Sequence, residues 1–347
     1  MKKVVSACVA CAMLLSLSAC QTAPSAQTTA AKTTAVTTIA KTSAATTTAQ
    51  TAAATTAVKT TAATTTAATT KTGENMSFTP PKPLFTMKEF PRVDGSTVTI
   101  PLSEAIYAAA CNVDMETARL NTLHNKTHNA YVNLIEGNAD IIFVTYPSEE
   151  EFQMAKDAGM ELEIVPVVKD AFVFLLNDEN PVDELSVEEI RQIYSGFITN
   201  WGILGGNSAS IIPYQRPVNS GSQSGMLELV MGEVEMMEAP SEMRPGGMGD
   251  LIEAVATYDN AVNAIGYSYY YYAEGMYSRE TTKYVAVNGV YPSNETVASG
   301  AYPFCTAYYA VLNKATPADA PARTLLDFML SEKGQTIAEE AGYVPLQ

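Results

Sequence analysis

The sequence contains little cysteine, histidine or tryptophan: five, two and one of them in 347 residues. Cys8, Cys11 and Cys20 lie near the start, so Cys111 and Cys305 alone remain for the body of the chain. This number excludes a scaffold held together by disulfide bonds. One bridge between Cys111 and Cys305 stays open, although isolated cysteines are most often buried small hydrophobic residues.

The two histidines limit the metal chemistry that the chain could perform. His124 and His128 are four residues apart, a spacing that can bind zinc when both lie on a helix. No glutamate separates them, and Asn125, Thr127 and Asn129 favour a loop. We therefore expect a polar loop here, with no metal site and no cofactor.

Acidic residues are absent before Glu74, and basic residues are scarce after it. The chain has 37 Asp and Glu against 21 Lys and Arg, and six of these lysines precede Glu74. Residues 74–347 therefore carry 15 basic side chains and a net charge near −22. Such a body repels nucleic acid phosphates and anionic headgroups, which argues against both as partners. An anion site in it must depend on local, desolvated hydrogen bonds.

The first twenty residues are typical of an export signal. Lys2 and Lys3 precede the apolar run of residues 4–17, which is too short to span a bilayer stably. The segment Leu17-Ser18-Ala19-Cys20 then resembles the bacterial lipobox. That resemblance implies that Cys20 becomes the lipid-modified first residue of an extracytoplasmic lipoprotein anchored to the cell membrane. A plain secretory signal is the alternative.

Residues 21–73 are almost wholly threonine and alanine. Such a segment has too few large apolar side chains to offset its conformational entropy, so we expect a disordered tether. About fifty flexible residues have a root-mean-square reach of roughly 40 Å. The folded part could then stand clear of a membrane surface.

One cation and several hydroxyl groups lie beside an expected helix start, in Arg216-Pro217-Val218-Asn219-Ser220-Gly221-Ser222. The first turn of a helix has N–H groups without partners, glycine lets a ligand approach the backbone, and the helix dipole favours negative charge. Arg216 could add a fork of donors. We interpret the segment as an oxyanion cradle, and an ordinary helix cap is the alternative.

Short apolar runs alternate with helical patterns between residues 91 and 347, as in an α/β protein. The run Leu162–Leu176 is long enough to cross between two domains. Tyr267 and Tyr269–Tyr272 could stack a sugar or base, but strand propensity and core packing explain most of such a run. We expect extended segments at 91–95, 97–100, 139–145, 162–176, 264–272 and 303–312, and helices at 101–110, 130–137, 149–158, 186–193, 249–258, 320–330 and 334–341.

Five motifs follow one another in a fixed order through this part of the chain. They are Asp94-Gly95-Ser96-Thr97 with Pro101; Asn180-Pro181-Val182 leading to residues 193–201; Arg216 with Ser220-Gly221-Ser222; Ala264-Ile265-Gly266-Tyr267; and Ser331–Gln335 with Gly342–Leu346. In this order they resemble the phosphate-type periplasmic solute-binding proteins, the receptors of ATP-driven phosphate importers.

The resemblance implies a two-lobed α/β fold of the type II-like periplasmic binding protein class. Each lobe is a sheet flanked by helices, and the lobes close like a hinge on a ligand in the interlobe cleft. It implies a monomer that captures inorganic phosphate for the permease subunits of an ABC transporter and is not an enzyme. The expected divisions are 1–20 signal peptide, 21–73 tether, 74–168 and 269–347 first lobe, and 169–268 second lobe.

The resemblance also implies which residues bind the anion. Arg216 would pair with it, Ser220 and Ser222 would supply hydroxyl donors, and Gly221 would supply its N–H. The opposite lobe would add the turn after Gly95. The expected ligand-binding residues are Ser96, Thr97, Thr99 as an alternative in that turn, Thr127, Thr145, Arg216, Ser220, Gly221 and Ser222.

Thr145 departs from the family pattern, which commonly has an aspartate there that accepts a proton from monohydrogen phosphate. A carboxylate at this place repels a fully ionised anion such as sulfate. Tyr146, Glu149 and Asp94 remain open as substitutes. Another oxyanion or a phosphorylated small molecule is the alternative ligand, and a tethered sensor or adhesin is the alternative function. Neither Ser220 nor its neighbours has a nearby histidine, which disfavours serine hydrolase chemistry.

Overall fold

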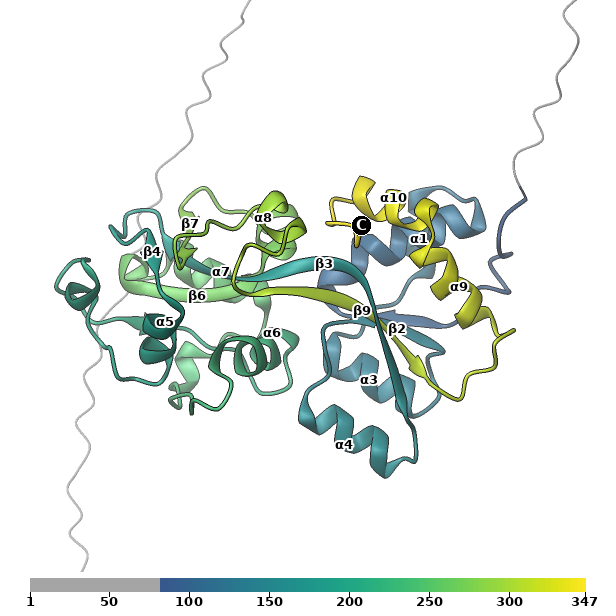
Figure 1. Cartoon of the computed structure of the whole chain (residues 1–347), viewed down its shortest axis with the longest axis horizontal. Coiled ribbons are helices and arrows are strands. Elements are labelled where there is room, and N and C mark those ends of the chain that lie inside the picture. Colours follow the sequence, from purple (N-terminus) through teal and green to yellow (C-terminus); the bar gives the residue numbers. More distant parts are fainter. Residues whose placement is uncertain (1–81) are drawn as a thin grey trace, which may run out of the picture. The chain divides into compact units, whose positions relative to one another are not determined.

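The computed structural model describes residues 82–347 (Figure 1). The predicted export signal, Cys20 and the tether of residues 21–73 lie outside the described residues. Within residues 82–347, no helix has both the length and the apolar character needed to cross a membrane.

The first lobe is built on four strands in the order β1-β2-β9-β3. Strand β1 is parallel to β2, and the other two pairings are antiparallel. Helices cover both faces, with α1, α9 and α10 on one side and α3 and α4 on the other (Figure 1). The elements are β1 (Val93–Gly95), α1 (Ile100–Cys111), α2 (Met115–Asn121), α3 (Thr127–Ile135), β2 (Ile141–Val144), α4 (Glu149–Asp157), β3 (Leu162–Asn177), β9 (Cys305–Asn313), α9 (Pro321–Leu330) and α10 (Glu332–Glu340).

The second lobe is built around the C-terminal half of β3, which pairs with β6 and β7, while β6 is parallel to β5. A separate parallel pair joins β4 to β8. The elements are β4 (Glu184–Leu185), α5 (Val187–Tyr194), β5 (Ile212–Pro213), α6 (Gly221–Gly225), a π-helix (Met226–Met231), α7 (Met248–Thr257), β6 (Ala264–Tyr269), a second π-helix (Tyr272–Met276), β7 (Thr282–Tyr284), β8 (Ala286–Val287) and α8 (Asn294–Ala298).

Strand β3 connects the two lobes, as its length and apolar composition predict. Residues 162–171 pair with β9, and Phe172–Leu176 pair with β6. The register with β9 shifts between Pro166 and Val168, because proline has no N–H to donate to the ladder. Strands β7 and β8 pair within the second lobe, whereas we expected every residue after 268 to belong to the first. We therefore propose that the chain returns to the first lobe at β9.

Helix caps explain why several predicted helices begin where they do. Ser186 and Glu189 form the predicted capping box of α5, and Ser148 and Glu151 form a second one at α4. The extended conformation expected for residues 97–100 is wrong, because Pro101 is tolerated in a first helical turn and a 3-10 turn runs directly into α1. The loop expected at residues 127–129 is also wrong, since α3 begins at Thr127.

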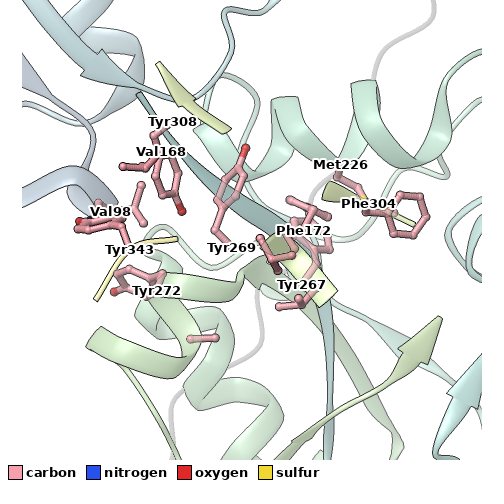
Figure 2. Packing of buried hydrophobic residues seen from close by; sticks show 14 of the residues in the cluster. Val98, Val168, Phe172, Met226, Tyr267, Tyr269, Tyr272, Phe304, Tyr308 and Tyr343 are labelled. Carbon is pink, nitrogen blue, oxygen red and sulfur yellow. Dashed lines mark hydrogen bonds between the residues drawn. The ribbon is translucent and has the colours of Figure 1, made fainter. Parts of the chain in front are cut away.

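Aromatic side chains fill the core where β3, β6 and β9 meet (Figure 2). Phe172 contacts Tyr267 and Tyr269, with ring centroids 5.4 and 5.3 Å apart, and Tyr308 contacts Tyr269 at 5.6 Å. Most of the predicted tyrosine run is therefore packing. The Cys111–Cys305 bridge that the sequence left open is not formed, because both thiols are free.

Candidate anion-binding site

A cavity of about 640 Å³ is lined by residues of both lobes. Seven of the nine predicted ligand-binding residues lie on its wall: Ser96, Thr97, Thr127, Thr145, Arg216, Ser220 and Gly221. Ser222 lies behind Arg216, and its Oγ accepts a hydrogen bond of 3.3 Å from Nη1. Thr99 is fully buried away from the cavity, because its hydroxyl donates to the carbonyl of Phe143.

Arg216 brings a buried positive charge to this cavity. Its side chain is held by the carbonyls of Pro245 and Gly246, each 3.0 Å from a guanidinium nitrogen, and the residue is 7% exposed. No carboxylate of the described residues lies within salt-bridge distance of it. Burial lowers the pKa of the guanidinium, because desolvation penalises its charge. Asp250 acts on the guanidinium in the opposite sense from beyond salt-bridge distance, so the described residues leave a desolvated cation without a direct counter-charge.

The backbone of Arg216 is fixed by two side chains of the second lobe. Its N–H lies 2.9 Å from the amide oxygen of Gln223 and 2.9 Å from the hydroxyl of Tyr267. Tyr267 in turn donates to Gln223. Because both partners are buried, they hold the backbone from which the guanidinium extends.

Thr145 faces the same cavity from the first lobe with an unused hydroxyl group. It follows the end of β2, and the hydroxyl of Tyr131 donates to its carbonyl over 2.8 Å. The residue is 2% exposed, and its Oγ1 has no hydrogen-bond partner among the described residues. A buried hydroxyl without a partner is costly, so this group is suited to contact a ligand.

Gly221 brings the second lobe against the first. A Cβ atom on it would lie 2.5 Å from Oγ1 of Thr127 and 2.7 Å from Oγ1 of Thr145. Only glycine fits so close an approach, so the backbone at the start of α6 stands directly against the two hydroxyl groups. Ser220 is the N-cap of α6, and its Oγ accepts from the N–H of Gln223 at 3.3 Å. Its hydroxyl hydrogen stays available for an acceptor.

Helix starts from both lobes line the cavity. The turn at Ser96 and Thr97 leads into α1, and Thr127 begins α3. The N–H groups of a first helical turn have no acceptor within the helix and carry the positive end of its dipole. Lys126, just before α3, has φ 71° and ψ 164°, a conformation that is strained for any residue with a side chain. The helix starts thus supply N–H donors to the cavity, and the strained backbone of Lys126 costs some stability.

The three substitutes considered for a carboxylate at position 145 lie elsewhere. Asp94 is buried below the turn and accepts hydrogen bonds from Gly95, Asn125 and Asn133, so its lone pairs are used within the first lobe. Tyr146 and Glu149 line a neighbouring hollow instead.

The two histidines do not share a site. His128 lines the cavity, and its Nδ1 lies 3.1 Å from a carboxylate oxygen of Glu151. His124 is partly buried, and desolvation lowers its pKa to about 4. Among residues 82–347 no three metal-binding side chains of the His, Cys, Asp or Glu type gather in one place.

Several residues of the cavity wall were not predicted to bind the ligand, among them Lys126, Asp250 and Tyr277, and Tyr269 and Tyr272 of the tyrosine run lie on the wall as well. Asp250 caps α7 by accepting a hydrogen bond of 2.9 Å from the N–H of Gly247. The Gly246-Gly247 pair followed by an acid three residues later is a cap signal that could have located it beside a helix start. Nothing in the sequence places that helix against Arg216.

Comparison with known proteins places the fold in one class. The model of the PBP superfamily domain matches residues 18–333. The chain therefore belongs to the PBP (periplasmic binding protein) superfamily, which confirms the expected α/β periplasmic binding protein fold and the resemblance on which it rested.

Among its relatives is a phosphate-binding protein PstS of Borreliella burgdorferi, 27% identical over 183 residues. The match covers 51% of this chain and 64% of that protein, so the chain spans less than two thirds of that relative's length. A phosphate-binding protein PstS of Staphylococcus aureus is 23% identical, over 72% of this chain and 76% of its own.

A solved structure from Clostridium perfringens, a putative phosphate ABC transporter substrate-binding protein with bound phosphate, superposes with a TM-score of 0.56. It is 26% identical and covers 74% of this chain and 98% of its own. An ABC-type phosphate transport receptor from Vibrio cholerae shares the fold at a TM-score of 0.54 and 20% identity, with 73% of this chain and 98% of its own covered.

Proposed function

We propose that this protein captures phosphate in the cavity between Arg216 and Thr145 and delivers it to an ABC-type importer. The observation that carries the proposal is the buried guanidinium of Arg216, which has no carboxylate partner and lies in one cavity with the unpaired hydroxyl of Thr145. An anion held there would neutralise the guanidinium and accept a hydrogen bond from the hydroxyl. The relatives' names, and the phosphate bound in the Clostridium perfringens structure, support phosphate as that anion.

The donors suit a small oxyanion through many short contacts. The guanidinium supplies charge, the hydroxyls of Ser96, Thr145 and Ser220 supply directed donors, and helix N–H groups supply the rest. Such contacts work at short range in a desolvated site, so they can overcome the repulsion from a body of net charge near −22.

We propose binding without covalent chemistry. A nucleophilic serine needs an adjacent base, and His128 of this cavity is engaged with Glu151. The hydroxyl of Ser220 serves as a helix cap. Hydrogen-bond donors without a nucleophile and base fit a receptor that hands its ligand on unchanged.

We propose that the protein functions outside the cytoplasm. PstS-like proteins are extracytoplasmic, which agrees with the export signal expected in residues 1–20. We further propose that Cys20 carries a lipid and that residues 21–73 form the tether between the membrane and the receptor, which meets the permease subunits as a monomer.

The absence of a carboxylate at position 145 favours a second candidate ligand, sulfate. The hydroxyl of Thr145 does not repel a fully ionised anion, whereas a carboxylate at that position would. Sulfate therefore belongs in every binding experiment as a competitor.

Calorimetric titration of phosphate into the full chain and into Arg216→Ala tests the proposal. We expect Arg216→Ala to weaken phosphate binding by about 2–4 kcal/mol, because truncation removes a buried positive charge from the cavity wall. Arg119→Ala is the matched control, since Arg119 lies on α2 and pairs with Glu104 outside the cavity. Equal phosphate affinities in Arg216→Ala and Arg119→Ala would refute the assignment.

A further inference from the structure

The cavity is larger than a phosphate ion needs. Its volume is about 640 Å³. A water molecule occupies about 30 Å³ of liquid, so a tetrahedral oxyanion fills a small part of that space, and cavities of 300–1,000 Å³ typically hold larger organic ligands. Separated lobes do not create the extra room, because Gly221 already stands against Thr127 and Thr145.

The chemistry of the wall changes from one end to the other. Around Thr145 and Gly221 the described side chains offer hydrogen-bond donors and no carboxylate. Beyond Arg216 the wall carries Asp250, an exposed acid of the second lobe. One of its oxygens accepts from the N–H of Gly247, and the described residues offer the other oxygen neither a hydrogen bond nor a salt bridge. The cavity therefore has a donor end and an acceptor end.

Aromatic and apolar side chains lie on the same wall as Asp250. Tyr272 and Tyr277 are stacked with ring centroids 6.0 Å apart, and Met248 lines the cavity beside them. A Cβ atom on Gly249 would lie 2.9 Å from the ring of Tyr277, so a glycine is needed for α7 to pack against these rings. Arg279 covers Tyr277 at 4.0 Å and fixes it in place. These side chains form an ordered apolar surface against which an alkyl chain can pack.

We propose that the cavity takes a phosphomonoester or phosphonate whose short organic arm ends in an ammonium group. The anionic head lies at Arg216 and Thr145, the methylene groups lie against Tyr272 and Met248, and the ammonium pairs with Asp250. The proposal rests on the proposed function for the anionic head and adds the class of organic arm. Asp250 then selects among phosphorylated compounds, because it attracts a cationic arm and repels an anionic one.

Calorimetric titration of the full chain with inorganic phosphate, ethyl phosphate and 2-aminoethyl phosphate tests the proposal. We expect 2-aminoethyl phosphate to bind about two- to fivefold more tightly than ethyl phosphate, as one ion pair with an exposed carboxylate allows. Asp250→Asn should abolish that difference, and the readout is the ratio of the two ester affinities, because Asp250 also acts electrostatically on Arg216 and its removal changes the affinity for every anion. Asparagine keeps an oxygen for the N–H of Gly247, so the cap of α7 survives.

Asp178→Asn is the control, because Asp178 is exposed and lies outside the cavity. Equal affinities for the two esters in the wild-type chain, or a difference that persists in Asp250→Asn, would overturn the proposal. If phosphate binds and neither ester does, the proposal of an organic arm is overturned, but the proposed function is not. Failure of all three ligands to bind overturns the proposed function as well, whereas binding of 2-aminoethyl phosphate without phosphate supports the arm and removes phosphate as the cargo.

Discussion

Arg216 and Asp94 show how two buried charges of one protein can have opposite roles. Asp94 accepts hydrogen bonds from Gly95, Asn125 and Asn133, so its charge is satisfied inside the first lobe. Arg216 donates to two backbone carbonyls and a hydroxyl group, which engage three of its five N–H groups without neutralising its charge. A buried charge without a counter-charge is costly unless a ligand supplies one. This contrast supports a structural role for Asp94 and the proposed binding role for Arg216.

The proposed role of Thr145 makes the protonation state of the ligand testable. We predict that Thr145→Asp weakens sulfate binding at least tenfold, because a carboxylate repels an anion that has no proton to donate. Phosphate should be affected less at a pH where its monohydrogen form can donate to the new carboxylate. Competition titrations at constant ionic strength measure both effects.

Thr145→Ser is the control for that experiment, since it keeps the hydroxyl and removes only a methyl group. Sulfate affinity that stays the same in Thr145→Asp and Thr145→Ser would show that the side chain at position 145 does not touch the anion.

Strand β3 is the element that joins the lobes, and it carries a buried acid at the crossing. Asp170 is 2% exposed and accepts hydrogen bonds from the hydroxyl of Tyr308 and the N–H of Tyr271. Tyr308 contacts Tyr343, which donates to the carbonyl of Val98. Burial raises the pKa of Asp170 to about 7, because desolvation outweighs these hydrogen bonds.

The raised pKa predicts how Asp170 contributes to stability. The unfolded carboxyl group ionises near pH 4, whereas the folded one keeps its proton up to about pH 7. The folded state binds more protons between these values, so the contribution of Asp170 to the free energy of unfolding falls as the pH rises from about 4 to about 7. Below pH 4 both states are protonated, and the contribution is constant.

The contribution of Asp170 lowers the free energy of unfolding as the pH rises from about 4 to about 7. We predict that this decrease with pH is smaller in Asp170→Asn than in the wild-type chain. Urea denaturation of both proteins between pH 4.5 and 7.5 gives the comparison, and the difference between the two curves isolates Asp170 from His124, whose lowered pKa acts in the opposite direction. Parallel curves would show that Asp170 titrates alike in both states.

At the scale of the whole molecule, an anion receptor works inside a strongly acidic body. Residues 74–347 carry a net charge near −22, so long-range electrostatics oppose the approach of the ligand. Affinity must come from contacts that form once the ligand is between the lobes. The contact of Gly221 with Thr127 and Thr145 brings donors of both lobes together, which makes closure part of binding.

The features that local sequence determines were the ones that could be predicted. The Ser186 and Glu189 box begins α5, and the apolar run of β3 crosses between the lobes, because caps and hydrophobic patterns act within a few residues. Arg216 was predicted from the ordered motifs, and Thr145 from the position where the resembling family commonly has an aspartate; both line the cavity. Asp250 was missed because its position beside Arg216 depends on the packing of α7, which no short-range pattern records. The start of α3 was missed because polar residues at 127–129 also fit a helix's first turn.

A crystal structure of the full chain grown with phosphate tests the central claim most directly. We predict density for a tetrahedral anion that contacts the guanidinium of Arg216, the hydroxyl of Thr145 and the N–H groups at the start of α6. An anion bound elsewhere, with the Thr145 hydroxyl still unpaired and Arg216 contacting only Pro245, Gly246 and Ser222, would contradict the account.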